Sequence, residues 1–178
     1  IALTPERKEA VGPISHLYAP NTHHHLRVGD WAAAFPDARV HAPAGLVKKR
    51  PDLKIHALHG APIDPDVTEI RIEGFRLEEA VLFHRPSRTL VVADLLHHLG
   101  KPDHWWTSLY TSVMGFNDRV AISRMIWIAA FSDRALARRC IGQVLELPFE
   151  RIVVGHGKPV TERPHDALAR VYGITRAG

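Results

Sequence analysis

The chain has 178 residues, 46% of them hydrophobic and 24% charged, which is enough to bury the core of one globular domain. Its net charge of +4 is mild and its basic residues are scattered, which argues against a nucleic-acid partner. A single cysteine, Cys140, excludes an intramolecular disulfide and a cysteine-based zinc site, so we expect a cytoplasmic protein. No run reaches the ~18 apolar residues of a membrane helix, and no membrane partner is expected.

The first third of the chain predicts helix, strand, helix and strand in that order. Thr4 is a helix N-cap, and Pro5 occupies the first helical position. The apolar run at residues 14–19 predicts a strand, residues 27–35 a helix, and residues 38–42 a second strand. Strand, helix and strand in series indicate parallel pairing through a crossover.

The middle of the chain predicts a surface loop followed by a meander of strands. Residues 43–66 are proline-rich and are interpreted as loop, with the basic triplet 48–50 solvated and a short strand at 54–58. Alternating apolar residues then predict three strands in series, the last two joined as a hairpin through Arg85-Pro86-Ser87: residues 68–73, 79–84 and 88–93.

The last third predicts mainly helices. Trp105 and Trp106 lie at the start of the first of them, and one of the two is expected in the core. Ser132 is the predicted N-cap of a helix that ends near Leu145 and carries Cys140 on its buried stripe. The remaining elements are a helix around 122–129, a strand at 151–154 and a closing helix at 164–172. There is no internal repeat or linker, so residues 1–178 are predicted to form one α/β domain.

Three predicted strands end on residues that bind metals. The first is followed by His23, His24 and His25, the second ends on Asp94, and the third ends on His156 between two glycines. Strand ends on one side of an α/β sheet converge, and imidazole and carboxylate suit zinc and other transition metals. The pattern therefore predicts a metal site. Three consecutive side chains cannot face one point, so at most two of the corner histidines should bind together.

Each of these residues also has a simpler interpretation. Asp94 could cap a following turn, His156 could be a turn residue bonded to a backbone carbonyl, and the histidine corner could be a solvated loop. His97 and His98 could line the same pocket, although a solvated loop is the favoured interpretation for this pair.

Several motifs together resemble the metallo-β-lactamase fold superfamily. They are the corner Pro-Asn-Thr-His-His-His at residues 20–25, the stretch at 35–40, the run at 83–90 with Asp94, and Gly-His-Gly at 155–157. The likeness covers nearly the whole chain. The closest likeness is to a branch whose members carry a Pro-Asn-x-x-His-His corner.

The resemblance implies an αββα sandwich with one or two divalent metal ions at one edge, zinc first, with iron or manganese as alternatives. In that superfamily the metal activates water for attack on an ester, thioester, amide or phosphodiester of a small-molecule substrate. Carried over by motif, Asp94 matches the bridging carboxylate and His156 the last histidine ligand. His24 and His25 match the adjacent Asp-His pair of the first motif.

The first motif departs from the usual His-x-His-x-Asp-His. Pro20 and Thr22 stand where its first two histidines belong, and His24 takes the place of the aspartate. A shift of one residue places Asn21 and His23 there instead. In both alignments the carboxylate that holds the second metal is missing.

The mid-chain histidine of the superfamily is also missing, and Glu78, Glu79 or His84 are the candidates to replace it. An incomplete two-metal site leaves two functions open. The first is a metal-dependent hydrolase, with the metal on His24, His25, Asp94 and His156. The alternative is a non-catalytic descendant of the fold that acts as a binding or interaction module.

The beginning of the chain is the last departure. It starts on Ile1 without an initiator methionine, so we expect that residues have been removed. Members of the fold open with a pair of strands before the first helix, and this chain has no room for them. The N-terminal strands are therefore expected to be missing or shortened, with the exposed sheet edge covered by another protomer of a homo-oligomer.

Overall fold

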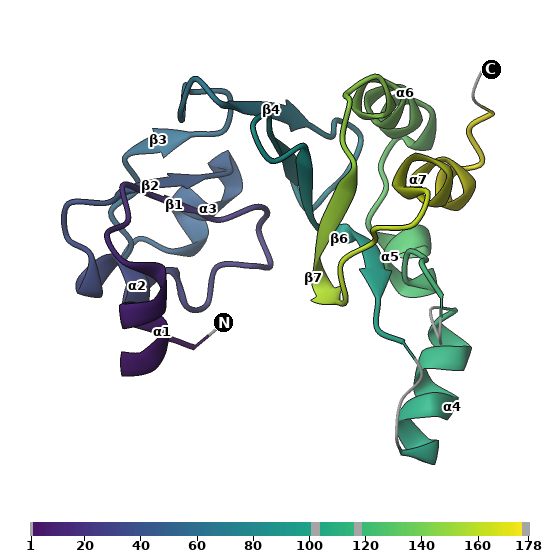
Figure 1. Ribbon diagram of the computed structural model, residues 1–178, viewed down its shortest axis with the longest axis horizontal. Coiled ribbons are helices and arrows are strands. Elements are labelled where there is room, and N and C mark those ends of the chain that lie inside the picture. Colours follow the sequence, from purple (N-terminus) through teal and green to yellow (C-terminus); the bar gives the residue numbers. More distant parts are fainter. Residues whose placement is uncertain (1, 101–103, 116–118, 176–178) are drawn as a thin grey trace. The chain divides into compact units, whose positions relative to one another are not determined.

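The computed structural model describes residues 2–100, 104–115 and 119–175, and the chain divides into two compact units (Figure 1). The first unit is Ile1–Ile63 and the second is Asp64–Gly178. Each unit has its own sheet, and the prediction of a single domain over the whole chain stays a prediction. Within the described residues, no helix has the length and apolar character needed to cross a membrane.

The first unit contains a parallel sheet of three strands in the order β1-β2-β3. The parallel pairing of the first two strands was predicted and is confirmed. Thr4 caps the first helix, as expected, because its hydroxyl accepts the Arg7 N–H at 3.3 Å. The elements are α1 (Pro5–Val11), β1 (His16–Tyr18), α2 (Val28–Ala34), β2 (Arg39–Ala42), α3 (Ala44–Lys49) and β3 (Ala57–Leu58).

The second unit is built on a four-stranded sheet in the order β4-β5-β6-β7. Its strands are β4 (Val67–Arg71), β5 (Ala80–His84), β6 (Thr89–His98) and β7 (Arg151–Gly157). The first three strands pair antiparallel, which confirms the predicted hairpin and meander, and β7 then pairs parallel to β6.

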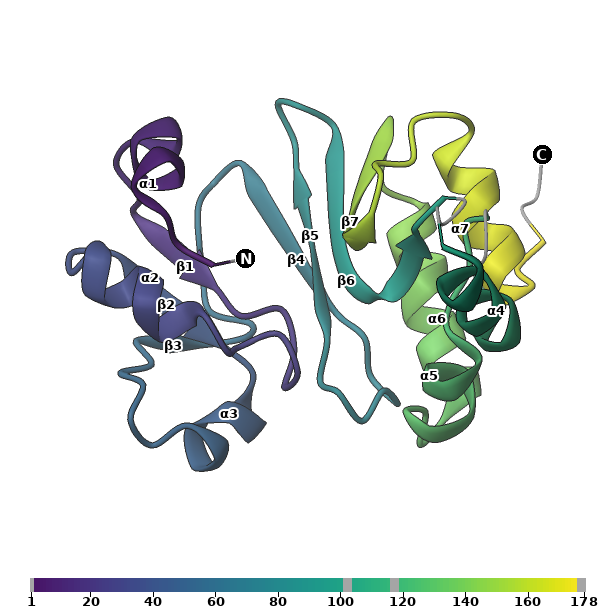
Figure 2. The same cartoon turned by 90° about the horizontal axis from the view of Figure 1, so that it is seen from below.

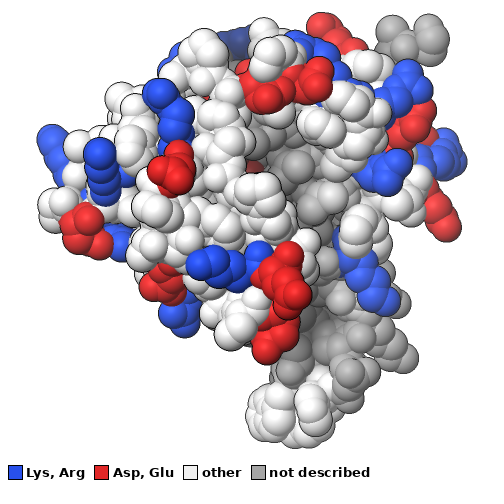
Figure 3. Space-filling model, turned by 60° about the vertical axis from the view of Figure 1, so that its left-hand side comes forward, with Lys and Arg blue, Asp and Glu red and all other residues white. Residues whose placement is uncertain are grey.

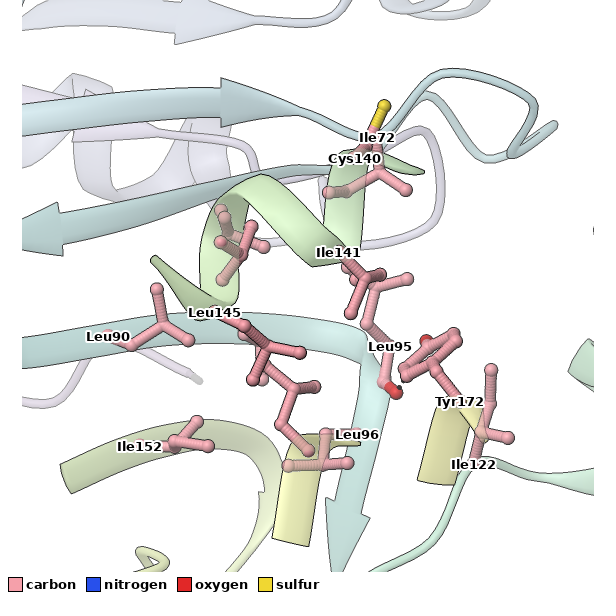
Figure 4. Close-up of a cluster of buried hydrophobic side chains, with 14 of the residues drawn as sticks. Ile72, Leu90, Leu95, Leu96, Ile122, Cys140, Ile141, Leu145, Ile152 and Tyr172 are labelled. Carbon is pink, nitrogen blue, oxygen red and sulfur yellow. Dashed lines mark hydrogen bonds between the residues drawn. The ribbon is translucent and has the colours of Figure 1, made fainter. Parts of the chain in front are cut away.

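Helices cover one face of this sheet (Figure 2). They are α5 (Arg124–Ala129), α6 (Arg134–Leu145) and α7 (Pro164–Tyr172), whereas α4 (Trp105–Met114) projects away from the sheet in Figure 1. The core lies between sheet and helices, where Leu95 and Leu96 of β6 meet Ile141 of α6 and Tyr172 of α7 (Figure 4). Cys140 is buried in this core, as predicted.

Two expectations for the helical part are wrong. Trp105 and Trp106 are both about two-thirds exposed, at 66% and 65%, so neither belongs to the core. Their rings instead stack on each other with centroids 3.8 Å apart. The N-cap of α6 is Asp133 rather than Ser132, because the Asp133 carboxylate accepts the Leu136 N–H at 2.9 Å.

This assignment of the cap predicts that Asp133→Ala lowers the free energy of unfolding by roughly 0.5–2 kcal/mol, since one N–H at the helix start loses its partner. Ser132→Ala is the matched control and should change stability by less than about 0.5 kcal/mol. Urea denaturation of both variants measures the difference. Equal losses in the two would show that Asp133 does not cap the helix.

Charged side chains are mixed over the surface. Figure 3 shows Lys and Arg standing singly or in small groups among acidic and uncharged residues on the face that it displays. This agrees with the scattered charges of the sequence, and no broad basic surface is visible on that face.

Candidate metal centre

Asp94 lies inside a strand rather than at its end, which corrects the prediction of a strand that stops at residue 93. β6 continues to His98, but its pairing with β7 is interrupted between Val92 and His97. Its pairing with β5 also ends at Val91. The four residues after Val92 therefore belong to neither ladder, and such a bulge re-aims the side chains that it carries.

Asp94 and His156 are brought together by the two neighbouring strands. The Asp94 carboxylate oxygen lies 3.4 Å from His156 Nε2. This distance exceeds the ~2.7–2.9 Å of a strong charge-assisted hydrogen bond. Two ligand atoms at ~2.1 Å from a tetrahedral ion lie about 3.4 Å apart, so the pair has the spacing of two ligands of one zinc ion. The Asp94 side chain is 7% exposed and that of His156 is 42%, which leaves the imidazole open to an incoming ion.

Glycines on β7 allow the bulge of β6 to approach closely. A Cβ at Gly155 would lie 3.1 Å from the Ala93 Cα. At Gly157, where φ is +115°, a Cβ would lie only 2.0 Å from the His98 carbonyl oxygen. The Gly-His-Gly pattern thus has a steric reason, because the backbone of β6 occupies the space that side chains would need on both sides of His156.

His97 packs against His156, and this corrects the favoured interpretation of His97 and His98 as a solvated loop. Both residues belong to β6, and His97 is buried. Its ring stacks on that of His156 with centroids 5.1 Å apart and an interplanar angle of 6°. His97 therefore limits the orientation of the His156 imidazole. The sequence signal was Leu95-Leu96, which resumes the apolar stretch after Asp94 and leads directly to His97.

The three candidates for the missing mid-chain histidine lie in different places. Glu78 sits in the turn before β5 with a positive φ of 54°. Glu79 is buried and its carboxylate accepts backbone N–H groups of the bulge. His84 is exposed at the far end of the hairpin, where its Nδ1 lies 2.7 Å from the Ser87 hydroxyl. The structure therefore does not bring His84 to the Asp94–His156 pair.

In the first unit, the histidine corner is a tight turn organised by Asn21. The fully buried Asn21 accepts the N–H groups of His23 at 2.9 Å and His24 at 2.8 Å through its side-chain oxygen. The three imidazoles then point to different surroundings, as expected for consecutive residues. His23 is exposed, His24 is half-buried and His25 is buried. Asn21 thus shapes the corner, and its oxygen is already used by the backbone.

The basic triplet at 48–50 supports this corner, which corrects its interpretation as a solvated loop. Residues 44–49 form helix α3. The Lys49 ammonium donates to the Thr22 carbonyl at 2.7 Å, and the Arg50 guanidinium donates to the His25 carbonyl at 3.1 Å. The sequence did not predict this helix, because prolines flank it on both sides, as they often flank a loop.

His25 is held by Arg50. The Arg50 guanidinium lies 3.2 Å from His25 Nδ1, and since arginine can only donate, that nitrogen accepts. Burial lowers the pKa of the His25 imidazole, and the nearby Lys49 and Arg50 cations lower it further. His25 is therefore a neutral imidazole with one ring nitrogen already engaged.

The chain matches no known protein-family model and no curated protein sequence. Solved structures do match. A metallo-β-lactamase from Pontibacter korlensis superposes with a TM-score of 0.60 at 10% identity, over 94% of this chain and 73% of its own. The metallo-β-lactamase FIM-1 from Pseudomonas aeruginosa, in its mono-zinc form, superposes with a TM-score of 0.55 at 13% identity, over 94% and 70%.

A metal-soaked flavodiiron core from Synechocystis gives a TM-score of 0.61 at 13% identity, over 89% of this chain and 42% of its own. The chain thus spans about 70% of the two β-lactamases and less than half of the flavodiiron core. None of these comparisons tests the Pro-Asn-x-x-His-His branch. The matches include both units, and they confirm the predicted fold class: the chain has the metallo-β-lactamase fold.

Proposed function

We propose that the chain is a metal-dependent hydrolase of a small ester, thioester, amide or phosphodiester. The observation that carries the proposal is the Asp94–His156 pair, whose 3.4 Å spacing fits two ligands of one ion. Its position on adjacent strands of a chain with the metallo-β-lactamase fold supports a metal rather than an ordinary ion pair. His24 and His25 remain the further ligands that the sequence motif proposes, and the Nδ1 of His25 is already engaged by Arg50.

The donor set favours a divalent transition metal, zinc first and iron or manganese as alternatives. The proposal allows one or two bound ions. When bound, the metal supplies a Lewis acid that polarises the substrate and activates water. Among the residues of the chain, the Asp94 carboxylate offsets the charge of the ion, and the packing of His97 keeps His156 Nε2 turned toward Asp94.

The experiment is metal analysis of protein purified without a histidine tag, after it is offered zinc, iron or manganese. We expect close to one equivalent in the wild type, and its loss in Asp94→Asn, because the amide removes the negative ligand. Binding below ~0.5 equivalent in the wild type contradicts the proposal, as does full binding by Asp94→Asn. Unchanged circular dichroism of the variant is the control for folding.

A further inference from the structure

Glu79 is a buried carboxylate that bonds to three consecutive backbone N–H groups. It is 1% exposed and immediately precedes β5. Its Oε1 accepts from Ala93 at 2.8 Å and its Oε2 accepts from Asp94 at 2.9 Å. A longer bond of 3.4 Å joins the Leu95 N–H to Oε1. The two oxygens of the Glu79 carboxylate thus accept the hydrogen bonds that a neighbouring strand would otherwise accept from these residues.

The need for that substitute follows from the register of the sheet. Pairing of β6 with β5 stops at Val91, and pairing with β7 is interrupted after Val92. Without Glu79, the N–H groups of residues 93–95 would be buried without these acceptors, and each unpaired N–H group would destabilise the fold. Backbone N–H groups are the partners that keep a buried carboxylate charged. Glu79 and the bulge therefore stabilise each other.

The bulge is also held from the side of α7. The buried Tyr172 hydroxyl donates to the Leu95 carbonyl at 3.0 Å. Burial raises the pKa of the Tyr172 phenol well above its usual value, and the Glu79 carboxylate raises it further, so the phenol keeps the proton that it donates. Glu79 and Tyr172 thus bind opposite polar groups of the same short segment.

We propose that Glu79 is a positioning residue of the metal centre: its carboxylate holds the backbone of residues 93–95 in the non-ladder conformation that presents the Asp94 carboxylate to His156. This inference rests on the proposed function, because it assigns Glu79 a role in metal affinity. Its physical basis is the direct bond to the Asp94 N–H, which fixes the residue that carries the ligand. Loss of such an outer partner typically weakens metal binding by ~10–100-fold.

The test compares zinc dissociation constants of the untagged protein and three variants, by competition with a chromophoric chelator. Glu79→Gln removes the charge and places N–H donors where an acceptor is needed. Glu79→Asp keeps the charge but is one methylene too short to reach the same N–H groups. Both should bind zinc ~10–100-fold more weakly. Ile152→Val is the control, since it removes one methylene from the same core at the position that pairs with Leu90, before the bulge begins. It should bind like the wild type.

A structural readout without metal accompanies the affinities. In amide NMR spectra of the metal-free protein, the N–H signals of Ala93, Asp94 and Leu95 should shift in both Glu79 variants and stay in place in Ile152→Val. If Glu79→Gln does not fold, Glu79→Asp alone carries the test.

Three results would overturn the inference. Zinc binding by Glu79→Gln as tight as that of Ile152→Val would show that Glu79 serves only the fold. Wild-type affinity in Glu79→Asp would assign the effect to charge rather than to position. A wild type that binds no zinc would overturn the proposed function itself, which distinguishes that failure from a failure of Glu79 alone.

Discussion

Gly157→Ala is expected to lower the free energy of unfolding by roughly 2–6 kcal/mol, the sum of about 1–3 for the strained backbone and 1–3 for overpacking. The φ of +115° suits glycine alone, and the new Cβ would lie 2.0 Å from the His98 carbonyl oxygen. That atom belongs to the backbone of β6 and cannot rotate away. Since domains are stable by about 5–15 kcal/mol, the substitution would remove much of the total. Urea denaturation followed by circular dichroism measures it.

Gly142→Ala is the matched control, with an expected effect of the opposite sign. Gly142 lies within α6, where a Cβ meets nothing within 4 Å. Alanine there should stabilise the protein by roughly 0.5–1 kcal/mol, because it restricts the unfolded chain. If Gly157→Ala were as well tolerated as Gly142→Ala, the close approach of β6 and β7 beside His156 would be wrong.

His156→Ala is expected to abolish turnover of generic ester, thioester or phosphodiester substrates. The loss should exceed the ~100-fold that follows removal of an outer-shell partner, because a proposed ligand itself is removed. The His156 side chain is 42% exposed, so its truncation should leave the fold intact. Initial rates at saturating metal, with circular dichroism as the check on folding, provide the measurement.

His84→Ala is the matched control for this experiment. It removes a histidine from the same unit, at the hairpin turn beside Ser87, and should leave the rates unchanged. Equal turnover by the His156→Ala variant and the wild type would contradict the proposed role. Metal binding without any turnover in the wild type would instead favour the alternative, a non-catalytic module.

Local sequence signals predicted most elements correctly. Thr4-Pro5 marks the start of α1, and the alternating residues around Arg85-Pro86-Ser87 mark the β5-β6 hairpin. These features depend on bonds between residues close in sequence, so the sequence carries them directly. Helix α3 was missed because prolines flank it in the sequence and because its side-chain contacts are with the distant residues 22 and 25.

For the candidate site, too, the sequence predicted the local features and missed those that depend on distant residues. The sequence alone indicated Asp94, His156 and the corner histidines as potential ligands. Their residue types and their positions after apolar runs can be recognised without a structure. It did not show that β6 continues to His98, because continuation depends on pairing with β7, some sixty residues away. A stretch that leaves one ladder and rejoins it looks locally like a strand that has ended.

The sequence alone thus determined the fold class and the residue types of the candidate metal centre. Only the tertiary structure decided which of them lie together and what holds them. The Asp94–His156 spacing depends on a bulge whose supports, Glu79 and Tyr172, lie 15 and 78 residues from Asp94 along the chain. Hydrogen bonds over such separations leave no periodic pattern in the sequence. A buried glutamate cannot be distinguished in the sequence from an exposed one.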